Sequence, residues 1–533
     1  MILNKRLADI SALQVPADPR KVLVRVARCK IAIITSGVLM AVGDGVPYIY
    51  FSDVFGVLPE VLEEYGAFNI ALVNDLPLFV DPFLLYDSQN SVYRELHDGI
   101  ITYLCFLRDR AIAGDLTPGA ISQWLLFKEI KQNWLGFSNT GNVGTGLGPE
   151  FARALAHNLT TAFKDFGNET ISHGSHLEKL GLLSSGVGRD HLSDFTTNLI
   201  KCYLLEYTQA FALAHVRPDQ RARFKVERVR FDYDTQRWQA DYFELPVSNG
   251  DYVILTPKEI LTRDEAWINQ TDLLNRFYDI CVSLPDEDLR AQVNDHFYRQ
   301  INKRTKEKEK RAAAMRTIER FHELLDYYIR WKEDHGLEAH RSAAAKVRET
   351  HQQFVENIKA LVSEHLAGTE FYRYDSSYEQ SMKRVLYLKH VIEDQGGHRL
   401  FYVNGQPIKR EVDLHVMFRL TWFDNSADLD LNAEVNNGRG PVDFKVSKGK
   451  KNASLVEFKL AKNSALEKNL RHQVAIYKKA SDAKTSIKVI MYFNDSELQR
   501  VVDIIKRLKL ADCKDIILID ASSKASASKA DEH

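Results

Sequence analysis

A set of polar residues near the C-terminus has the types and spacing of a metal-dependent hydrolytic centre. It comprises Asp443 in GRGPVDF, Glu457 and Lys459 in VEFKLA, and Gln473 and Tyr477 in HQVAIY. Neighbouring carboxylates repel one another unless a cation lies between them, and Mg²⁺ binds one or two protein carboxylates together with water and phosphate oxygens. A lysine adds a compact charge that can stabilise a negative transition state. The pattern predicts Mg²⁺-dependent phosphodiester hydrolysis, with Mn²⁺ as a substitute ion.

Two short strands are needed to position these carboxylates. Apolar residues alternate with Asp443 in the segment 442–446 and with Glu457 and Lys459 in the segment 456–460, which is the period of a half-buried strand. The polar stretch SKGKKNAS between them suits a hairpin loop. Because a hairpin would bring Asp443 opposite Glu457, we expect both carboxylates and the lysine at one edge of a sheet.

A helix is expected directly after the second strand. The sequence SALE at 464–467 is a capping-box pattern and precedes an apolar stripe at helical spacing. Gln473 and Tyr477 are four residues apart and would share one side of this helix, although Tyr477 lies on the apolar stripe and has core packing as its alternative role. The remaining elements are predicted as a strand, a helix and a strand at 487–492, 496–508 and 516–519.

This order of D, E-x-K and Q-x-x-x-Y resembles the PD-(D/E)xK nuclease superfamily, and the final element resembles its RecB-like branch. The resemblance covers roughly residues 378–520. It implies a restriction-endonuclease-like α/β core, in which helices flank a mixed sheet. It also implies metal-binding carboxylates, a catalytic lysine and an accessory helix motif, which would be Asp443 with Glu457, Lys459, and Gln473 with Tyr477.

The resemblance implies one further metal-binding acid upstream of the two strands. Glu434 in LNAEVNNGRGPVDF is the candidate, although its sequence context is typical of a loop or strand and not of a helix. Glu411 is the alternative, on an expected helix at 408–423, but we favour a solvent-facing position for it. Another helix, at 378–395, is expected to pack beside that one on the catalytic sheet.

Basic residues surround the expected centre. Between residues 439 and 479 lysine and arginine outnumber the acidic residues, and such side chains bind polyphosphates by releasing counterions, without reading sequence. A lysine-rich surface that only favours solubility is the alternative interpretation. We expect nucleic-acid contacts from Arg439, Lys445, Lys462 and Arg471.

The whole chain has the composition of a globular protein with several domains. Its 533 residues exceed one ordinary domain, and its net charge of −1 means that any nucleic-acid surface must be local. The five cysteines are far apart, which predicts reduced thiols and no structural zinc. The apolar stretch 31–42 is shorter than a membrane span. We expect a cytoplasmic protein with no membrane partner.

The expected fold class is α/β multidomain. A mixed α/β recognition or sensor domain is expected at 1–283, a helical connector at 284–370, the nuclease domain at 371–520 and a disordered tail at 521–533. Gly336 is expected to break the connector into a helical hairpin. This hairpin is either an arm that contacts a second copy or a partner protein, or a packed spacer, and we favour the spacer because sustained heptads are not clear.

The N-terminal domain shows both helical and strand patterns. Strands at 223–233 and 237–245 alternate about a turn, which predicts a hairpin. Apolar residues at helical spacing predict helices. These helices are at 91–110, 117–132, 148–166 and 191–216.

Three other segments resemble binding sites less closely. GNVGTGLG at 141–148 precedes an expected helix but lacks the ending of a phosphate-binding loop, so we interpret it as a flexible turn. HGSH, with His173 and His176, has no further ligand nearby and is interpreted as a surface loop. GVGRDHLSD at 186–194 is expected to be a helix start with acidic first-turn residues, or part of a second pocket.

The sequence thus favours a Mg²⁺-dependent DNA endonuclease, with restriction-like or antiviral defence as its expected role by analogy. An RNA nuclease with the same centre is the second hypothesis. A nucleic-acid-binding or assembly protein without catalytic activity is the third.

Overall fold

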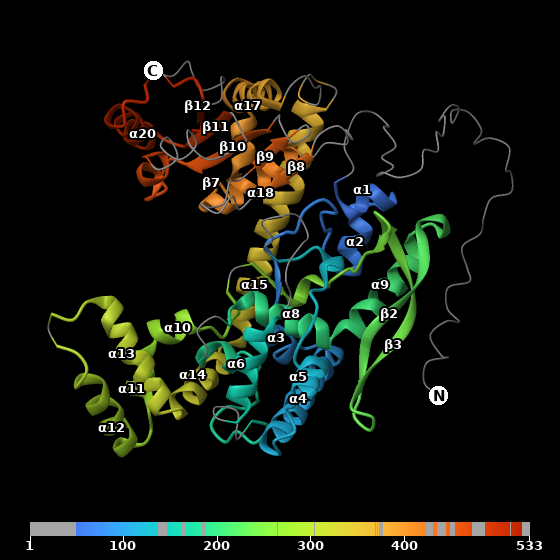
Figure 1. Cartoon of the computed structure of the whole chain (residues 1–533), viewed down its shortest axis with the longest axis vertical. Coiled ribbons are helices and arrows are strands. Elements are labelled where there is room, and N and C mark those ends of the chain that lie inside the picture. Colours follow the sequence, from blue (N-terminus) through green and yellow to red (C-terminus); the bar gives the residue numbers. More distant parts are fainter. Residues whose placement is uncertain are drawn as a thin grey trace. The chain divides into compact units, whose positions relative to one another are not determined.

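The structure is a computed structural model, and the residues that it describes begin at Ile49. The chain divides into two units, Met1–Leu39 and Met40–His533, and every described residue belongs to the second unit. Figure 1 shows the helices and strands of this unit coloured along the sequence. The described residues are 49–136, 147–160, 166–183, 187–263, 265–302, 304–367, 369, 371, 377–422, 430–433, 444–447, 453–471, 485–511 and 513–524.

The first part of the second unit is mixed α/β, as predicted. Its strands form an antiparallel sheet in the order β2-β3-β4 and a separate antiparallel pair, β1 with β5. The strands are β1 (Phe79–Val80), β2 (Arg221–Asp232), β3 (Arg237–Ser248), β4 (Asp251–Tyr252) and β5 (Leu261–Thr262). The helices are α1 (Phe51–Phe55), α2 (Pro59–Tyr65), α3 (Pro82–Tyr86), α4 (Ser91–Ile112), α5 (Pro118–Trp124), α6 (Pro149–Leu159), α7 (Lys179–Leu183), α8 (Arg189–Leu199) and α9 (Lys201–His215).

The helix expected at 148–166 is α6, which ends at Leu159. Two other predicted N-terminal helices also differ from the structure. The helix expected at 117–132 ends at Trp124, because the chain after it turns to pair Phe127 with Leu147 and to bury Ile130. The segment 191–216 forms two helices, α8 and α9, that meet at Ile200. Tertiary packing overrides local helical preference in both places.

A helical segment follows the N-terminal part. The break predicted at Gly336 is confirmed, and a side chain at this position would collide with the carboxylate of Asp87. The last helix of the segment contains two π-helical turns, Gln352–Glu356 and Leu361–Leu366. The α-helices are α10 (Gln270–Asn275), α11 (Phe277–Ser283), α12 (Glu287–Tyr298), α13 (Glu307–Arg320), α14 (Glu323–Asp334), α15 (Gly336–His351) and α16 (Asn357–Ala360).

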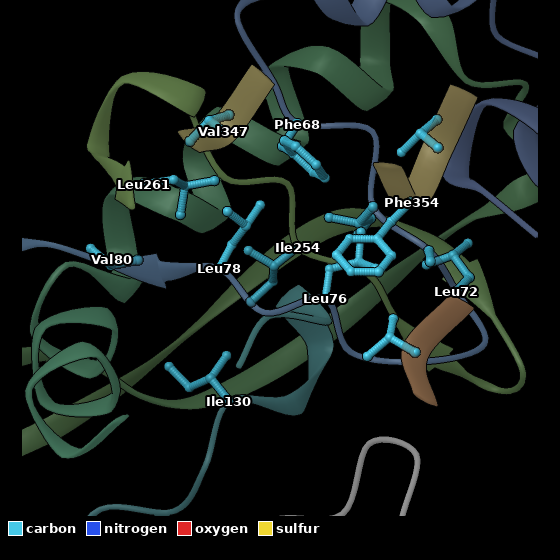
Figure 2. Close-up of a cluster of buried hydrophobic side chains, with 14 of the residues drawn as sticks. Phe68, Leu72, Leu76, Leu78, Val80, Ile130, Ile254, Leu261, Val347 and Phe354 are labelled. Carbon is cyan, nitrogen blue, oxygen red and sulfur yellow. The ribbon is translucent and has the colours of Figure 1, made fainter. Parts of the chain in front are cut away.

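The part of the helical segment after Gly336 packs into the N-terminal core. Val347 of α15 and Phe354 of the first π turn belong to the same buried cluster as Leu76 and Ile254 (Figure 2). Phe354 has no exposed surface. This packing supports the spacer interpretation of the arm.

The C-terminal part contains a five-stranded mixed sheet in the order β12-β11-β10-β9-β8 (Figure 1). The strands β8, β9 and β10 are antiparallel neighbours, whereas β11 runs parallel to both β10 and β12. The sheet strands are β8 (Asp430–Ala433), β9 (Phe444–Ser447), β10 (Ala453–Leu460), β11 (Thr485–Tyr492) and β12 (Ile516–Asp520). The other elements are α17 (Ser377–Asp394), the pair β6 (Tyr402–Val403) and β7 (Gln406–Pro407), α18 (Glu411–Trp422) and α20 (Asp495–Arg507), and residues 466–471 are also helical.

Helices cover both faces of this sheet. Alternation along β10 sends Val456 and Phe458 to one face, where Phe458 stacks on Phe418 of α18 with ring centroids 4.0 Å apart. On the other face, Ile490 of β11 packs with Val501 of α20. The two apolar layers fix the register of the central strands, because a slip by one residue would exchange their faces.

Three further predictions concern the chain as a whole. No described helix is long and apolar enough to cross a membrane. The four described cysteines, Cys105, Cys202, Cys281 and Cys513, are free thiols. Ala521, at the start of the predicted tail, is buried and donates to the Tyr492 carbonyl, while residues 525–533 lie outside the described part.

Candidate active site on the C-terminal sheet

Glu457 and Lys459 lie on one face of β10, the central strand of the sheet. They are two residues apart, so the alternation of a strand places both side chains on the same face. Their partners in the parallel register are Lys488 and Ile490 of β11. This is the face on which Ile490 packs under α20. The strand predicted at 456–460 is therefore confirmed, and it holds the E-x-K motif in the middle of the sheet.

Glu457 forms a buried ion pair with the next strand. Its Oε2 atom lies 3.0 Å from Nζ of Lys488, and the two side chains are 1% and 8% exposed. An ion pair at this depth costs much of its Coulombic energy in desolvation, and losing one partner leaves a buried charge. Glu457 is therefore held by an ammonium within the sheet and is not presented to solvent at its edge.

Lys459 is paired with an acid from α18. Its Nζ atom lies 2.6 Å from Oε1 of Glu411, and both side chains are partly exposed. Asn463, just after β10, donates from its amide to Oε2 of Glu411, and His415 Nε2 lies 3.7 Å from Oε1, the oxygen that pairs with Lys459. His415 also donates to the Phe458 carbonyl at 2.8 Å. These contacts hold the first turn of α18 against the end of β10.

The expectation that Glu411 faces solvent is therefore wrong. Helix α18 begins at Glu411, where a negative side chain is favoured by the helix dipole. The start of this helix lies beside the end of β10, so the carboxylate meets Lys459 and Asn463. The structure thus brings Glu411 together with Lys459 and Asn463, although Glu411 belongs to a separate segment of the sequence.

The other predicted site residues differ in their burial and their partners, and some lie outside the described part. Lys462 is half-buried and donates to the Ile408 carbonyl at 2.8 Å, and burial together with the nearby charge of Lys409 lowers its pKa. Arg471 is exposed and pairs with Glu467 at 2.8 Å. Lys445 lies in β9, where its backbone is the register partner of Leu455 in β10. The predicted residues outside the described part are Glu434, Arg439, Asp443, Gln473 and Tyr477.

The described oxygen ligands fit Mg²⁺ in kind. Among the described residues, no group of three or more His, Cys, Asp or Glu side chains is close enough to hold a metal ion. Glu457 and Glu411 nevertheless supply carboxylates, which Mg²⁺ binds in combination with water and phosphate oxygens.

Sequence reasoning missed Lys488. It lies between Ile487 and Val489 in a strand that is otherwise apolar and buried. A lysine in such a position needs a partner, because an unpaired buried charge is costly. That signal was present in the sequence, but the identity of the partner depends on the parallel register of β10 and β11.

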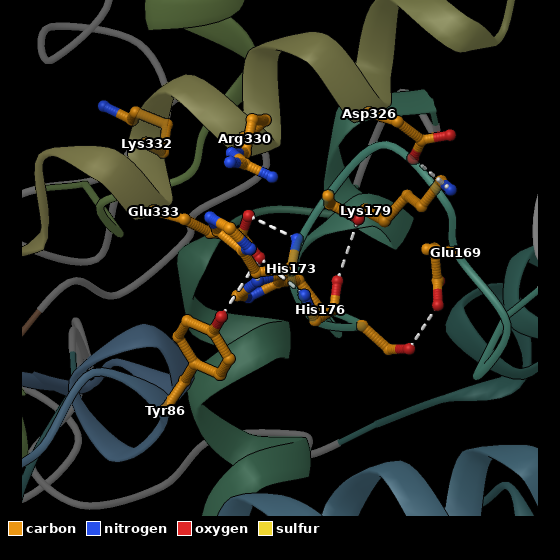
Figure 3. Close-up of polar contacts among 12 residues, drawn as sticks. Tyr86, Glu169, His173, His176, Lys179, Asp326, Arg330, Lys332 and Glu333 are labelled. Carbon is orange, nitrogen blue, oxygen red and sulfur yellow. Dashed lines mark hydrogen bonds and ion pairs between the residues drawn. The ribbon is translucent and has the colours of Figure 1, made fainter.

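A second polar cluster, around Glu333 of α14, joins the helical segment to the N-terminal part (Figure 3). Its carboxylate accepts from the backbone N–H groups of His173 at 2.7 Å and Gly174 at 2.8 Å, from His176 Nε2 at 2.9 Å and from the Tyr86 hydroxyl at 3.2 Å. Burial alone would raise the pKa of Glu333, but these donors outweigh it and the pKa is lowered. These hydrogen bonds hold α14 against the loop that contains HGSH.

The surface-loop interpretation of HGSH is therefore wrong for one of its two histidines. His176 is 1% exposed, whereas His173 is half exposed and lies 3.5 Å from Asp334. His97 is also buried in this region, with its ring centroid 5.9 Å from that of His176. Burial, and secondarily the proximity of His176, lowers the pKa of His97 to about 3.

We expect the buried His97 to make the protein sensitive to acid. Its folded-state pKa of about 3 lies below the ordinary value of 6.5, so the unfolded chain binds a proton that the folded chain does not, and stability falls as the pH decreases from about 6.5 towards 3. His97→Gln should reduce this dependence by about 1.4 kcal/mol per pH unit, measured by urea unfolding between pH 6 and pH 4. The half-exposed His173→Gln is the control, and an equal change in both variants would contradict the assignment.

The GVGRDHLSD segment forms both structures that its sequence predicted. It starts α8, with Asp190 in the first turn, and it lines a pocket of about 360 Å³. Arg189 lies over the Phe79 ring and 3.7 Å from Glu265, another residue of the pocket wall. Burial raises the pKa of Asp190. In GNVGTGLG, residues 141–146 lie outside the described part.

Comparison with known proteins gives two matches, both to families without an assigned function. Residues 56–269 are similar to a domain of unknown function (DUF8370). Residues 377–495 are similar to another domain of unknown function (DUF8371), and this match includes α17, α18 and strands β8 to β11. No curated protein and no solved structure matches the chain.

Proposed function

We propose that the C-terminal part of this chain is a Mg²⁺-dependent DNA endonuclease with a restriction-endonuclease-like core. The observation that carries the proposal is the E-x-K motif on the central strand β10, with Lys459 bound to Glu411 of α18 at 2.6 Å. An acid and a lysine on one strand, met by a second acid from a helix, are the residue types that phosphodiester hydrolysis requires.

The topology of the sheet supports this proposal. Two antiparallel strands, β8 and β9, lead into β10, the helical residues 466–471 lie between β10 and the parallel strand β11, and α20 connects β11 to β12. From β9 onward, this is the element order that accompanies the resemblance to the PD-(D/E)xK superfamily. Asp443 is proposed as the second carboxylate of the centre, since it directly precedes β9 and β9 pairs with β10 up to Phe444 and Val456. Glu411 is proposed as the upstream acid in place of Glu434.

Each residue of the proposed centre would have a separate role in the reaction. When bound, Mg²⁺ supplies Lewis-acid chemistry at a phosphate oxygen. Glu457, with Asp443 and Glu411, would hold the ion. Lys459 would offset the negative charge that develops on the phosphate, and Glu411 keeps its ammonium in position at the end of β10. Arg471, which is exposed, would contact the nucleic-acid backbone.

One observation favours a different function. The Glu457–Lys488 pair is almost fully buried, as expected of a carboxylate that stabilises the sheet and binds no metal. The C-terminal part would then bind nucleic acid or a partner protein without cutting. Restriction-like or antiviral defence stays a prediction under either hypothesis.

Cleavage of supercoiled plasmid in the presence of Mg²⁺ or a chelator tests the proposal. We expect nicked and linear DNA with Mg²⁺ or Mn²⁺ and no product with the chelator. A folded RNA of similar length, digested in parallel, should be cut more slowly, and faster RNA cleavage would favour the RNA nuclease. Binding to DNA that weakens with salt but never yields strand breaks would favour the non-catalytic function.

A further inference from the structure

We propose that Lys488 competes with the divalent cation for the carboxylate of Glu457 and so weakens metal binding at this site. This inference rests on the proposed function, because it concerns the same centre. It assigns to Lys488 a role that no motif in the sequence indicates. The residue would set the cation concentration at which the enzyme becomes active.

The geometry makes this competition direct. Lys488 Nζ lies 3.0 Å from Glu457 Oε2, within hydrogen-bonding distance, so the ammonium occupies one side of the carboxylate. Lys488 and Glu457 are direct partners in the parallel register. The backbone of Lys488 is also held on its far side, where its N–H group donates to the Asp515 carbonyl at 2.7 Å. Because its backbone is held on both sides, β11 cannot shift in a way that would move Lys488 away from the Glu457 carboxylate.

Burial makes the competition strong. Glu457 is 1% exposed and the Lys488 side chain is 8% exposed, and like charges repel more strongly where water is excluded. A divalent ion at Glu457 would approach an ammonium at close range. It must then either displace this ammonium or share the carboxylate with it, and both reduce the affinity of the site for the ion.

Replacing the ammonium with a neutral side chain of similar length should therefore tighten metal binding. We expect Lys488→Met to bind Mn²⁺ about tenfold more tightly than the parent protein by isothermal titration calorimetry, an effect of the size that groups around a metal site commonly have. The variant should melt at a lower temperature without metal, since Glu457 loses a neighbouring positive charge. Saturating Mn²⁺ should raise its melting temperature more than that of the parent.

Three variants isolate the charge from the general loss of a buried ion pair. Lys488→Arg keeps the positive charge and should bind Mn²⁺ as weakly as the parent. Lys488→Gln is neutral and can still donate to Glu457, so it serves if the methionine variant does not fold. Lys179→Met removes another well-buried lysine, which belongs to α7 and not to the C-terminal sheet and pairs with Asp326 at 2.6 Å; it should lower the melting temperature without changing the response to Mn²⁺.

The possible results separate this inference from the proposed function. Equal Mn²⁺ affinity of the parent and both neutral variants would overturn the competition but leave the metal site in place. Tightening in Lys488→Arg as well would also overturn it, because the charge would not be the cause. Failure of every protein to bind Mn²⁺ would refute the metal centre itself, and with it both proposals.

Discussion

Lys459→Ala is expected to lower the rate of plasmid cleavage by about 10²- to 10³-fold, the size of the effect when a charge-stabilising group is removed from an active site. Its ammonium is the described positive charge nearest to Glu411 on the sheet, at 2.6 Å. The side chain is 14% exposed and reaches solvent, so we expect the truncated protein to remain folded. The measurement is the single-turnover nicking rate with saturating Mg²⁺, and Asp443→Ala should give a similar loss.

A second lysine in the same part of the chain provides the control. Lys389 of α17 forms an ion pair with Glu393 at 2.5 Å and is also partly exposed. Lys389→Ala should cut plasmid at the parental rate, because α17 packs with Val456 and Phe458, on the face of the sheet opposite the E-x-K side chains. Parental cleavage by Lys459→Ala, with circular dichroism showing a folded protein, would mean that the site is assigned to the wrong residues.

The second large effect is expected at Asp413, where α18 is joined to the N-terminal part. Asp413 lies 2.7 Å from Arg263 and 2.8 Å from Arg410, and the side chains of Asp413 and Arg263 are 5% and 7% exposed. Asp413→Ala leaves the guanidinium of Arg263 buried without this carboxylate. We expect the free energy of unfolding to fall by about 3–5 kcal/mol, measured by urea denaturation.

An exposed ion pair shows how much of this effect depends on burial. Arg330 and Asp334 lie 3.3 Å apart on α14, with side chains 41% and 51% exposed. Asp334→Ala should therefore cost no more than about 1 kcal/mol. A similarly small loss in Asp413→Ala would show that Arg263 is well solvated without its partner. Because Asp413 is two residues from Glu411, its replacement should also loosen the contact with Lys459.

Much of the C-terminal architecture could be predicted from the sequence because its signals are local. The strand predicted at 456–460 lies within β10, and the helices predicted at 378–395 and 496–508 agree with α17 and α20 to within about one residue at each end. Strand alternation, capping residues and apolar stripes act over a few residues. These signals therefore specify a helix or strand regardless of which other elements pack against it.

The partners of the site residues could not be predicted in the same way. Glu411 and Lys459 are brought together only when α18 packs against the end of β10, and Glu457 meets Lys488 only through the parallel register of two strands. His176 is buried because Glu333, 157 residues away in the sequence, lies beside it. These contacts depend on tertiary packing, about which a single short motif carries no information.

The two π-helical turns after α15 change the direction in which this helix presents its side chains. A π turn holds about one more residue than an α turn, so the side chains that follow are rotated by roughly 100° around the axis. Phe354, inside the first wide turn, points into the N-terminal core, whereas Asn357, just after it, donates to the carbonyl of Leu400 at 2.7 Å. The helix therefore presents its side chains in different directions before and after the first π turn. Deleting one residue from 352–356 would turn Asn357 away from its acceptor while leaving the preceding contacts of α15 in place.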